Sequence, residues 1–276
     1  MHSMLARHGG FVLLAFLAAS GPAFAAAACR AASQTLVLPL VELYTSEGCD
    51  SCPPADRWMA SRFPARTGGS GAVALAFHVD YWDRLGWRDR FATHANTERQ
   101  YAARRENGGA FVYTPQVLVQ GRDVSHWNTD ADEAINAASQ QAGRARIAVD
   151  AMTAPREVRL HIVAQVPDAP SRGDAKAFAA YADSGLESEI GAGENRGVRL
   201  VHAHVVRAFR EVGGFDATGS LDTRISLDRP AEAGTDPTLV VFVQRMSNGD
   251  VLQTLALSLE ACTSRQCTTC ASSPER

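Results

Sequence analysis

The most informative stretch of the chain is VELYTSEGCDSCPPAD, residues 41–56. Its first residues are mainly apolar, which predicts a buried strand. Proline has no backbone N–H, and the N–H groups in the first turn of a helix have no partner within that helix. Pro53 and Pro54 are therefore compatible only with the first turn of a helix. The pair Cys49 and Cys52 is therefore predicted on the turn between a buried strand and the start of a helix.

A Cys-x-x-Cys pair in this position suits thiol–disulfide exchange. Two cysteines three residues apart can close a disulfide with little backbone change, and the first-turn N–H groups of the helix favour a thiolate at Cys49. A thiolate is the species that attacks disulfides, so Cys49 is predicted to attack and Cys52 to resolve. Asp50 between them opposes thiolate formation, because a like charge raises the pKa of its neighbour. The alternatives are a static disulfide or half of a zinc site.

Residues 34–143 are predicted to form an α/β domain in the order β-α-β-α-β-β-α. The motif Cys-x-x-Cys follows the first strand, and Thr114-Pro115 lies at the start of the third strand. This order and these two landmarks together indicate the thioredoxin layout. The expected elements are strand 40–44, a helix from residue 51 or 52 to before Pro64, strand 72–79, helix 82–106, strand 116–120 with a short partner strand after residues 121–123, and a helix from residue 129 or 130 to 143.

Several polar residues are predicted near the cysteine pair. Pro115, preceded by Thr114, is expected to be cis and to hold an edge open for an extended peptide, the alternative being an ordinary trans proline. The cluster that contains His78, Asp80 and Trp82 follows the second strand, where it could line a substrate groove or form a packing collar. A second set of alternatives concerns Glu42, which could take the proton of Cys52 or pair with an arginine.

From residue 145 the hydrophobic period changes to two, which predicts a small antiparallel β-sandwich over residues 145–258. Asn248-Gly249 is a hairpin signal between the last two strands. His202 and His204 are expected on one face of a strand, more typical of surface histidines than of metal ligands. The strand candidates are 147–151, 158–166, 177–181, 198–209, 221–227, 239–244 and 251–257.

The beginning of the chain predicts export. Residues 1–25 have a polar start, an apolar run too short to span a bilayer and the cleavage pattern Ala23-Phe24-Ala25, which together indicate a signal peptide. We expect no membrane span after cleavage, and a periplasmic or secreted protein in which disulfides form. The pairing of the remaining cysteines, at positions 29, 262, 267 and 270, stays open, with residues 259–276 as a cysteine-containing tail.

The charge and composition of the chain limit the classes of molecule that it is expected to bind. The chain has 276 residues, with 27 basic and 30 acidic side chains and a net charge of −3, so nothing favours nucleic acid as a partner. No cofactor is predicted. No metal site is predicted either, because His78 and Asp80 lack an evident third ligand.

Three groups of short sequence segments, called blocks below, are similar to segments of a known family. Together they resemble domain-of-unknown-function family 1223, exported thioredoxin-like proteins of bacteria, over about residues 36–257. The resemblance implies a thioredoxin-like fold and no established substrate. Glu47 stands where glutamine is common in the family, which changes the charge beside Cys49. The blocks are VELYTSEGCDSCPPAD at 41–56; HVDYWD at 78–83 with LGW at 85–87, RQY at 99–101 and YTPQ at 113–116; and GEN at 193–195 with VVR at 205–207.

Three functions fit these observations. The first is an exported thiol–disulfide oxidoreductase that acts on protein thiols or disulfides, with Cys49 and Cys52 as the catalytic pair and Thr114 and Pro115 presenting the substrate strand. The second is a non-enzymatic scaffold that binds a ligand or a protein and keeps a permanent Cys49–Cys52 disulfide. The third is a copper or zinc handler that uses the two cysteines and His78.

Overall fold

Two β-sheets and a small hairpin form the scaffold of this mixed α/β protein. The computed structural model describes residues 28–64, 71–232 and 234–263. The larger sheet has the strand order β14-β13-β8-β11-β3-β2-β4-β5, the smaller sheet the order β1-β6-β7-β12, and β9 pairs with β10. The strands are β1 (Ala28–Ala32), β2 (Leu40–Thr45), β3 (Val73–His78), β4 (Gln116–Val119), β5 (Arg122–Asp123), β6 (Arg146–Thr153), β7 (Glu157–Gln165), β8 (Ala175–Ser184), β9 (Leu186–Glu189), β10 (Arg199–His202), β11 (Val205–Gly214), β12 (Ser220–Asp228), β13 (Thr235–Arg245) and β14 (Val251–Ser258).

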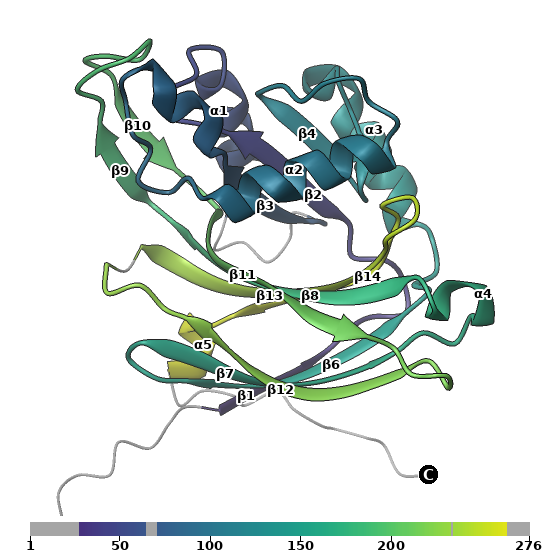
Figure 1. The fold of residues 1–276 in the computed structure, drawn as a ribbon. Helices are drawn as coiled ribbons and strands as arrows, with labels where there is room; N and C mark the ends of the chain where they lie inside the picture. Colours follow the sequence, from purple (N-terminus) through teal and green to yellow (C-terminus); the bar gives the residue numbers. More distant parts are fainter. Residues whose placement is uncertain (1–27, 65–70, 233, 264–276) are drawn as a thin grey trace, which may run out of the picture.

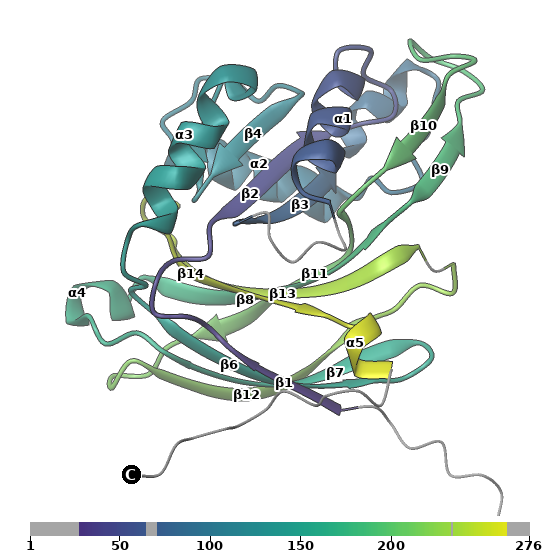
Figure 2. The same ribbon diagram turned by 180° about the vertical axis from the view of Figure 1, so that it is seen from behind.

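The helices cover both faces of the β2–β4 part of the larger sheet. Figure 1 shows α2 in front of these strands, and the reverse view in Figure 2 shows α1 and α3 on the other face. Strands β2 and β3 are parallel and fully buried along their length, because helices pack against both faces of the sheet at these strands. The helices are α1 (Pro53–Arg62), the short 3₁₀ helix η1 (Asp80–Leu85), α2 (His94–Glu106), α3 (Trp127–Ser139), α4 (Ala169–Arg172) and α5 (Glu260–Thr263).

The second half of the chain extends the same sheet. Strand β11 pairs with β8 antiparallel and meets β3 in parallel at Val205 and Ala76, which joins the two halves of the eight-stranded sheet. One apolar core lies between this part of the sheet and the four-stranded sheet. A second core brings residues of β2 and β3 together with Phe178 of β8 and Phe242 of β13. The halves are therefore held together by apolar packing as well as by strand pairing.

Most of the predicted elements are present, and three expectations are wrong. The helix expected over 82–106 is interrupted, because Gly86 ends η1 at φ +99° and Thr93 caps the separate helix α2 by accepting a hydrogen bond from Asn96. The strand expected over 198–209 is divided into β10 and β11. Between them lies His204 at φ +56°, so His202 and His204 do not share a strand face. The third helix begins at residue 127, two or three residues before its predicted start at 129 or 130.

A disulfide joins the two ends of the described chain. Cys29 in β1 bonds to Cys262 in α5, 233 residues away. The predicted signal peptide, residues 1–25, and the two remaining tail cysteines, at positions 267 and 270, lie outside the described residues. Among residues 28–64, 71–232 and 234–263, no helix is both long and apolar enough to cross a bilayer.

Candidate functional site

The Cys-x-x-Cys pair forms a disulfide at the junction of β2 and α1. The Cα atoms of Cys49 and Cys52 are 5.4 Å apart, and both residues are 0% exposed. Pro53 and Pro54 occupy the start of α1 as predicted, with Cys52 as the N-cap residue. Pro53 and Pro54 have no N–H groups, and those of Ala55 and Asp56 donate to the carbonyl of Cys52. The pair nevertheless lies at the positive end of the α1 dipole, which favours negative charge on sulfur.

The loop before β4 lies against the sulfur of Cys49. The Thr114–Pro115 peptide bond is cis, as predicted. The Thr114 hydroxyl donates to Cys49 Sγ at 3.3 Å and accepts from the indole N–H of Trp82 at 2.8 Å. Within the described residues, neither the backbone N–H nor the carbonyl of Thr114 has a hydrogen-bond partner. The loop thus presents the unpaired N–H and carbonyl of Thr114 close to Cys49.

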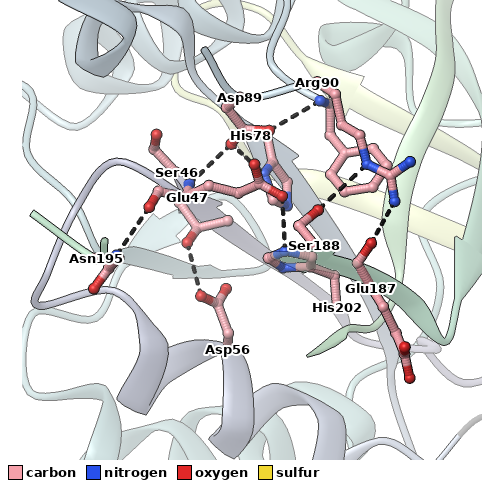
Figure 3. Close-up of polar contacts among 12 residues, drawn as sticks. Ser46, Glu47, Asp56, His78, Asp89, Arg90, Glu187, Ser188, Asn195 and His202 are labelled. Carbon is pink, nitrogen blue, oxygen red and sulfur yellow. Dashed lines mark hydrogen bonds and ion pairs between the residues drawn. The ribbon is translucent and has the colours of Figure 1, made fainter. Parts of the chain in front are cut away.

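A buried network of charged groups lies behind the cysteine loop, and Asp89 is at its centre (Figure 3). Its carboxylate accepts from the backbone N–H groups of Glu47 and Phe91, each at 2.9 Å, and from Nδ1 of His78 at 2.6 Å. Burial alone would lower the pKa of His78, but the Asp89 carboxylate raises it above its ordinary value. Burial alone would raise the pKa of Asp89, and His78 with the backbone donors lowers it. The two groups therefore form a buried ion pair.

Glu47 is the second acidic group of this network. Its carboxylate accepts from the indole N–H of Trp87 at 2.7 Å and from Nε2 of His202 at 3.1 Å. Burial acts to raise the pKa of Glu47, but these donors lower it below its ordinary value. The rings of His202 and His78 lie 4.9 Å apart, so the His202–Glu47 contact is next to the His78–Asp89 pair. Figure 3 shows that the network links the loop before Cys49 to the β9–β10 hairpin.

A third carboxylate lies on α1, one turn after Cys52. Asp56 accepts a hydrogen bond from the Thr45 hydroxyl at 3.2 Å, and burial raises its pKa. Despite this concentration of carboxylates and imidazoles, no group of three or more metal-ligating side chains is arranged to hold an ion among the residues that the structure describes. The cluster is organised as ion pairs and hydrogen bonds.

The hairpin formed by β9, β10 and their connecting loop covers the cysteine turn. The side-chain amide of Asn195 donates to the carbonyl oxygens of Glu47 and Cys49, both at 2.9 Å. The next contact comes from Glu194, whose carboxylate accepts from the backbone N–H of Asp50 at 3.2 Å. At the base of the hairpin, Arg90 donates to the hydroxyl of Ser188 and to the carbonyl of Glu187 (Figure 3).

Not all of the predicted site residues lie at the disulfide. Thr114 and Trp82 meet Cys49, directly and through one hydrogen bond respectively. His78 is 1% exposed and lies in the buried network. Asp80 instead accepts from the hydroxyl of Thr97 on α2 at 2.6 Å. Neither His78 nor Asp80 forms a hydrogen bond to the disulfide in the described part of the chain.

Two other predictions concern single side chains. Glu42 pairs with Arg99, whose Nε donates at 2.8 Å, so the arginine partner expected for it is confirmed. His202, expected at the surface, is 3% exposed and binds Glu47, so that expectation is wrong. The reason is that β10 packs against α1 and turns this side chain inward.

Sequence reasoning gave no role to most of the network. Asp89 and Asn195 carry no motif of their own, and Asn195 is 146 residues from the cysteine that it contacts. The only signal was that GEN at 193–195 belongs to a block shared with the resembled family, which marked the segment without assigning it a position.

Comparison with known proteins supports the family. A family model described as a protein of unknown function, DUF1223, matches residues 40–244. Comparison with curated proteins gives no match to this chain. Among solved structures, the X-ray crystal structure of a protein from Agrobacterium tumefaciens is 28% identical, with a TM-score of 0.56, over 82% of this chain and 96% of that one. HBP35 of Porphyromonas gingivalis is 14% identical, with a TM-score of 0.57, over 88% of this chain and 81% of that one, a likeness of fold alone. Because the family model covers most of the chain, the protein belongs to the DUF1223 family of unknown function.

Proposed function

We propose that this protein is an exported, thioredoxin-like thiol–disulfide oxidoreductase whose reactive pair is Cys49 and Cys52. The observation that carries the proposal is the position of the Thr114–Pro115 loop against the pair. The Thr114 hydroxyl donates to the sulfur of Cys49 at 3.3 Å, and the pair lies at the start of α1. A periplasmic or secreted location suits both disulfides, since such bonds persist in oxidising compartments.

The partner in this proposal is a protein dithiol in an extended segment. The unpaired backbone N–H and carbonyl of Thr114 can pair with such a segment as a short β-strand would, which places a partner sulfur next to Cys49. Residues 34–143 would carry the exchange chemistry. Residues 145–258 would select or dock the partner, and they already supply the hairpin that contacts the cysteine turn.

The exchange starts from the oxidised pair that the structure holds. A partner thiolate attacks the sulfur of Cys49, the Cys49–Cys52 bond breaks, and Cys52 leaves as a thiolate that takes a proton. A second thiolate of the same partner then attacks the partner sulfur bonded to Cys49. The partner leaves as a disulfide, the pair becomes a dithiol, and two electrons have passed from the partner to the pair.

A second candidate function is a binding scaffold with a permanent disulfide. The specific observation in its favour is that both cysteines are 0% exposed beneath the cysteine loop and the hairpin. Exchange therefore requires the loop or the hairpin to move before a partner sulfur reaches Cys49, whereas a scaffold requires no such movement.

The reduction potential of the Cys49–Cys52 pair distinguishes the two functions. We expect a value above about −300 mV, because structural disulfides usually lie below that value and exchanging ones above it. The protein is equilibrated in glutathione buffers of graded potential, and each cysteine is followed by differential alkylation and peptide mass spectrometry. The Cys29–Cys262 bond, in the same molecule, is the internal reference for a structural disulfide. A Cys49–Cys52 potential below about −300 mV, at the level of that reference, would favour the scaffold.

A further inference from the structure

We infer that Glu194 and Asn195 are positioning residues of the Cys49–Cys52 pair: Asn195 fixes the backbone that carries Cys49, and Glu194 holds a negative charge beside it. The inference rests on the proposed function for its biological meaning, but it concerns a property of the pair that can be measured directly. It extends the site to a hairpin that is more than a hundred residues from the cysteines in sequence.

Asn195 holds the cysteine turn from outside. Its amide group has two hydrogens, and it donates to the carbonyl oxygens of Glu47 and Cys49, both at 2.9 Å. Asn195 itself is 6% exposed, so these hydrogen bonds compete little with water. The carbonyl groups on either side of Gly48 are thereby fixed relative to each other, which restrains the backbone that would have to move to expose Cys49.

The loop that carries Asn195 is itself well anchored. Backbone hydrogen bonds join Gly197 N–H to Ile190 O at 2.7 Å and Val198 N–H to Asn195 O at 3.0 Å. Gly193 has φ +74°, and a Cβ atom at this position would come within 3.2 Å of Trp87, so the loop packs closely on that side chain. Trp87 in turn donates to Glu47, which closes a ring of contacts from the hairpin to the cysteine loop.

Side-chain contacts also hold the β9–β10 hairpin in place along its two strands. His202, the last residue of β10, donates to the buried carboxylate of Glu47 at 3.1 Å. Arg90 donates to the Ser188 hydroxyl and to the Glu187 carbonyl in β9, and it forms an ion pair with Glu232 at 2.9 Å. Asn195 is thus presented by a segment fixed at several points.

Glu194 adds a second negative charge, besides that of Asp50, at the cysteine turn. Its carboxylate accepts from the N–H of Asp50, the peptide group that directly follows Cys49, at 3.2 Å. A negative charge at this point disfavours the Cys49 thiolate. Because a disulfide couple becomes more oxidising when its reduced form is stabilised, Glu194 makes the pair harder to reduce.

The substitution Glu194→Gln tests the charge effect, since glutamine keeps an oxygen that can accept from Asp50 N–H. In glutathione buffers, we expect the equilibrium of the Cys49–Cys52 pair to shift toward the dithiol by about two- to five-fold, the range for an exposed charge interaction. The Cys29–Cys262 equilibrium should not move. The matched control is Glu189→Gln, an exposed glutamate of the same hairpin that pairs with Arg199 instead.

The substitution Asn195→Ala tests the restraint. Loss of both hydrogen bonds should raise the rate at which dithiothreitol reduces Cys49–Cys52 by about tenfold or more. Asn248→Ala, in a turn that contacts Asp250, is the matched control and should leave this rate unchanged. Because the rate is compared with that of Cys29–Cys262 in the same sample, a general loss of folding would show as acceleration of both bonds.

The inference is overturned if Glu194→Gln leaves the Cys49–Cys52 equilibrium within error of the wild-type value. It is also overturned if Asn195→Ala leaves the reduction rate of the pair unchanged or accelerates both disulfides equally. These outcomes are independent of the proposed function. A pair that responds to Glu194 and Asn195 but never exchanges with a partner would refute the oxidoreductase and leave the positioning roles intact.

Discussion

Replacement of Arg99 by methionine should lower the free energy of unfolding by about 3–5 kcal/mol, because it leaves a buried carboxylate without its partner. The guanidinium of Arg99 donates to Glu42 at 2.8 Å, and the side chains are 9% and 2% exposed. The same guanidinium lies 4.8–5.4 Å from the centres of four phenylalanine rings, contacts that add to the loss. Urea unfolding of the Arg99→Met protein, followed by circular dichroism, measures this effect.

A double substitution separates the cost of leaving a buried charge unpaired from the cost of losing the whole Glu42–Arg99 pair. When Glu42→Leu is combined with Arg99→Met, most of the lost stability should return, since apolar residues of similar size can replace a buried pair at little cost. Arg144→Met, which removes an exposed partner of Asp250, serves as the control and should cost less than about 1 kcal/mol. A single Arg99→Met protein as stable as this control would contradict the role assigned to the pair.

Replacement of His78 by phenylalanine should cost a similar amount, about 3–5 kcal/mol, because Asp89 would keep a buried charge without a counter-ion. The His78 and Asp89 side chains are 1% and 0% exposed, and they are joined at 2.6 Å. Asp89 also fixes the backbone of Glu47 through its N–H, so the substitution should loosen the loop before Cys49 as well. Urea unfolding near neutral pH measures the loss.

The His78–Asp89 pair also predicts how the stability of the protein depends on pH. Because the folded-state pKa of His78 is raised above its ordinary value of 6.5, its contribution is complete below that pH and is lost as pH rises through the raised value. The contribution of Asp89, whose pKa is lowered, is present above its ordinary value of 3.8 and is lost only as pH falls through the lowered value. The His78→Phe protein should therefore lack the alkaline decline in stability that we expect for the wild type.

A histidine at the surface provides the control for both measurements. His161 pairs with Asp222 at 2.8 Å on the outer face of the four-stranded sheet, and its partner is 67% exposed. His161→Phe should change the free energy of unfolding by less than about 1 kcal/mol. If His78→Phe and His161→Phe behave alike at every pH, the buried network is not a source of stability.

Local signals explain which parts of the fold could be predicted. The prolines after Cys52 and the apolar run before Cys49 are read from neighbouring residues alone, and the structure confirms the strand and the helix that they predict. The helix expected over 82–106 is interrupted at Gly86 and begins again after Thr93, and the contacts that hold the segment between them are not local. Asp89 turns inward to bind His78 and Glu47 N–H, and these partners come from other strands and loops, so the chain leaves the helical path there.

The candidate site was predictable only near the cysteines. The contact of Thr114 with Cys49 follows from the expected layout, because a loop at the start of one strand was predicted to meet the turn after its neighbour. The contacts of Asn195 and His202 depend on how β9 and β10 return across α1, which no periodicity in the sequence specifies. Contacts between side chains so far apart in the sequence can be identified only from the tertiary structure.

Reactivity of Cys49 in the folded protein tests the exchange chemistry most directly. The Cys52→Ser protein is reduced and mixed with an extended cysteine peptide whose sulfur is bonded to thionitrobenzoate, and the released coloured thiolate is followed by absorbance. We expect Cys49 to form a mixed disulfide with the peptide, identified by peptide mass spectrometry, faster than Cys52 reacts in the Cys49→Ser protein. If Cys49 reacts only after urea has unfolded the chain, the pair is a buried structural bond and the proposed exchange does not occur.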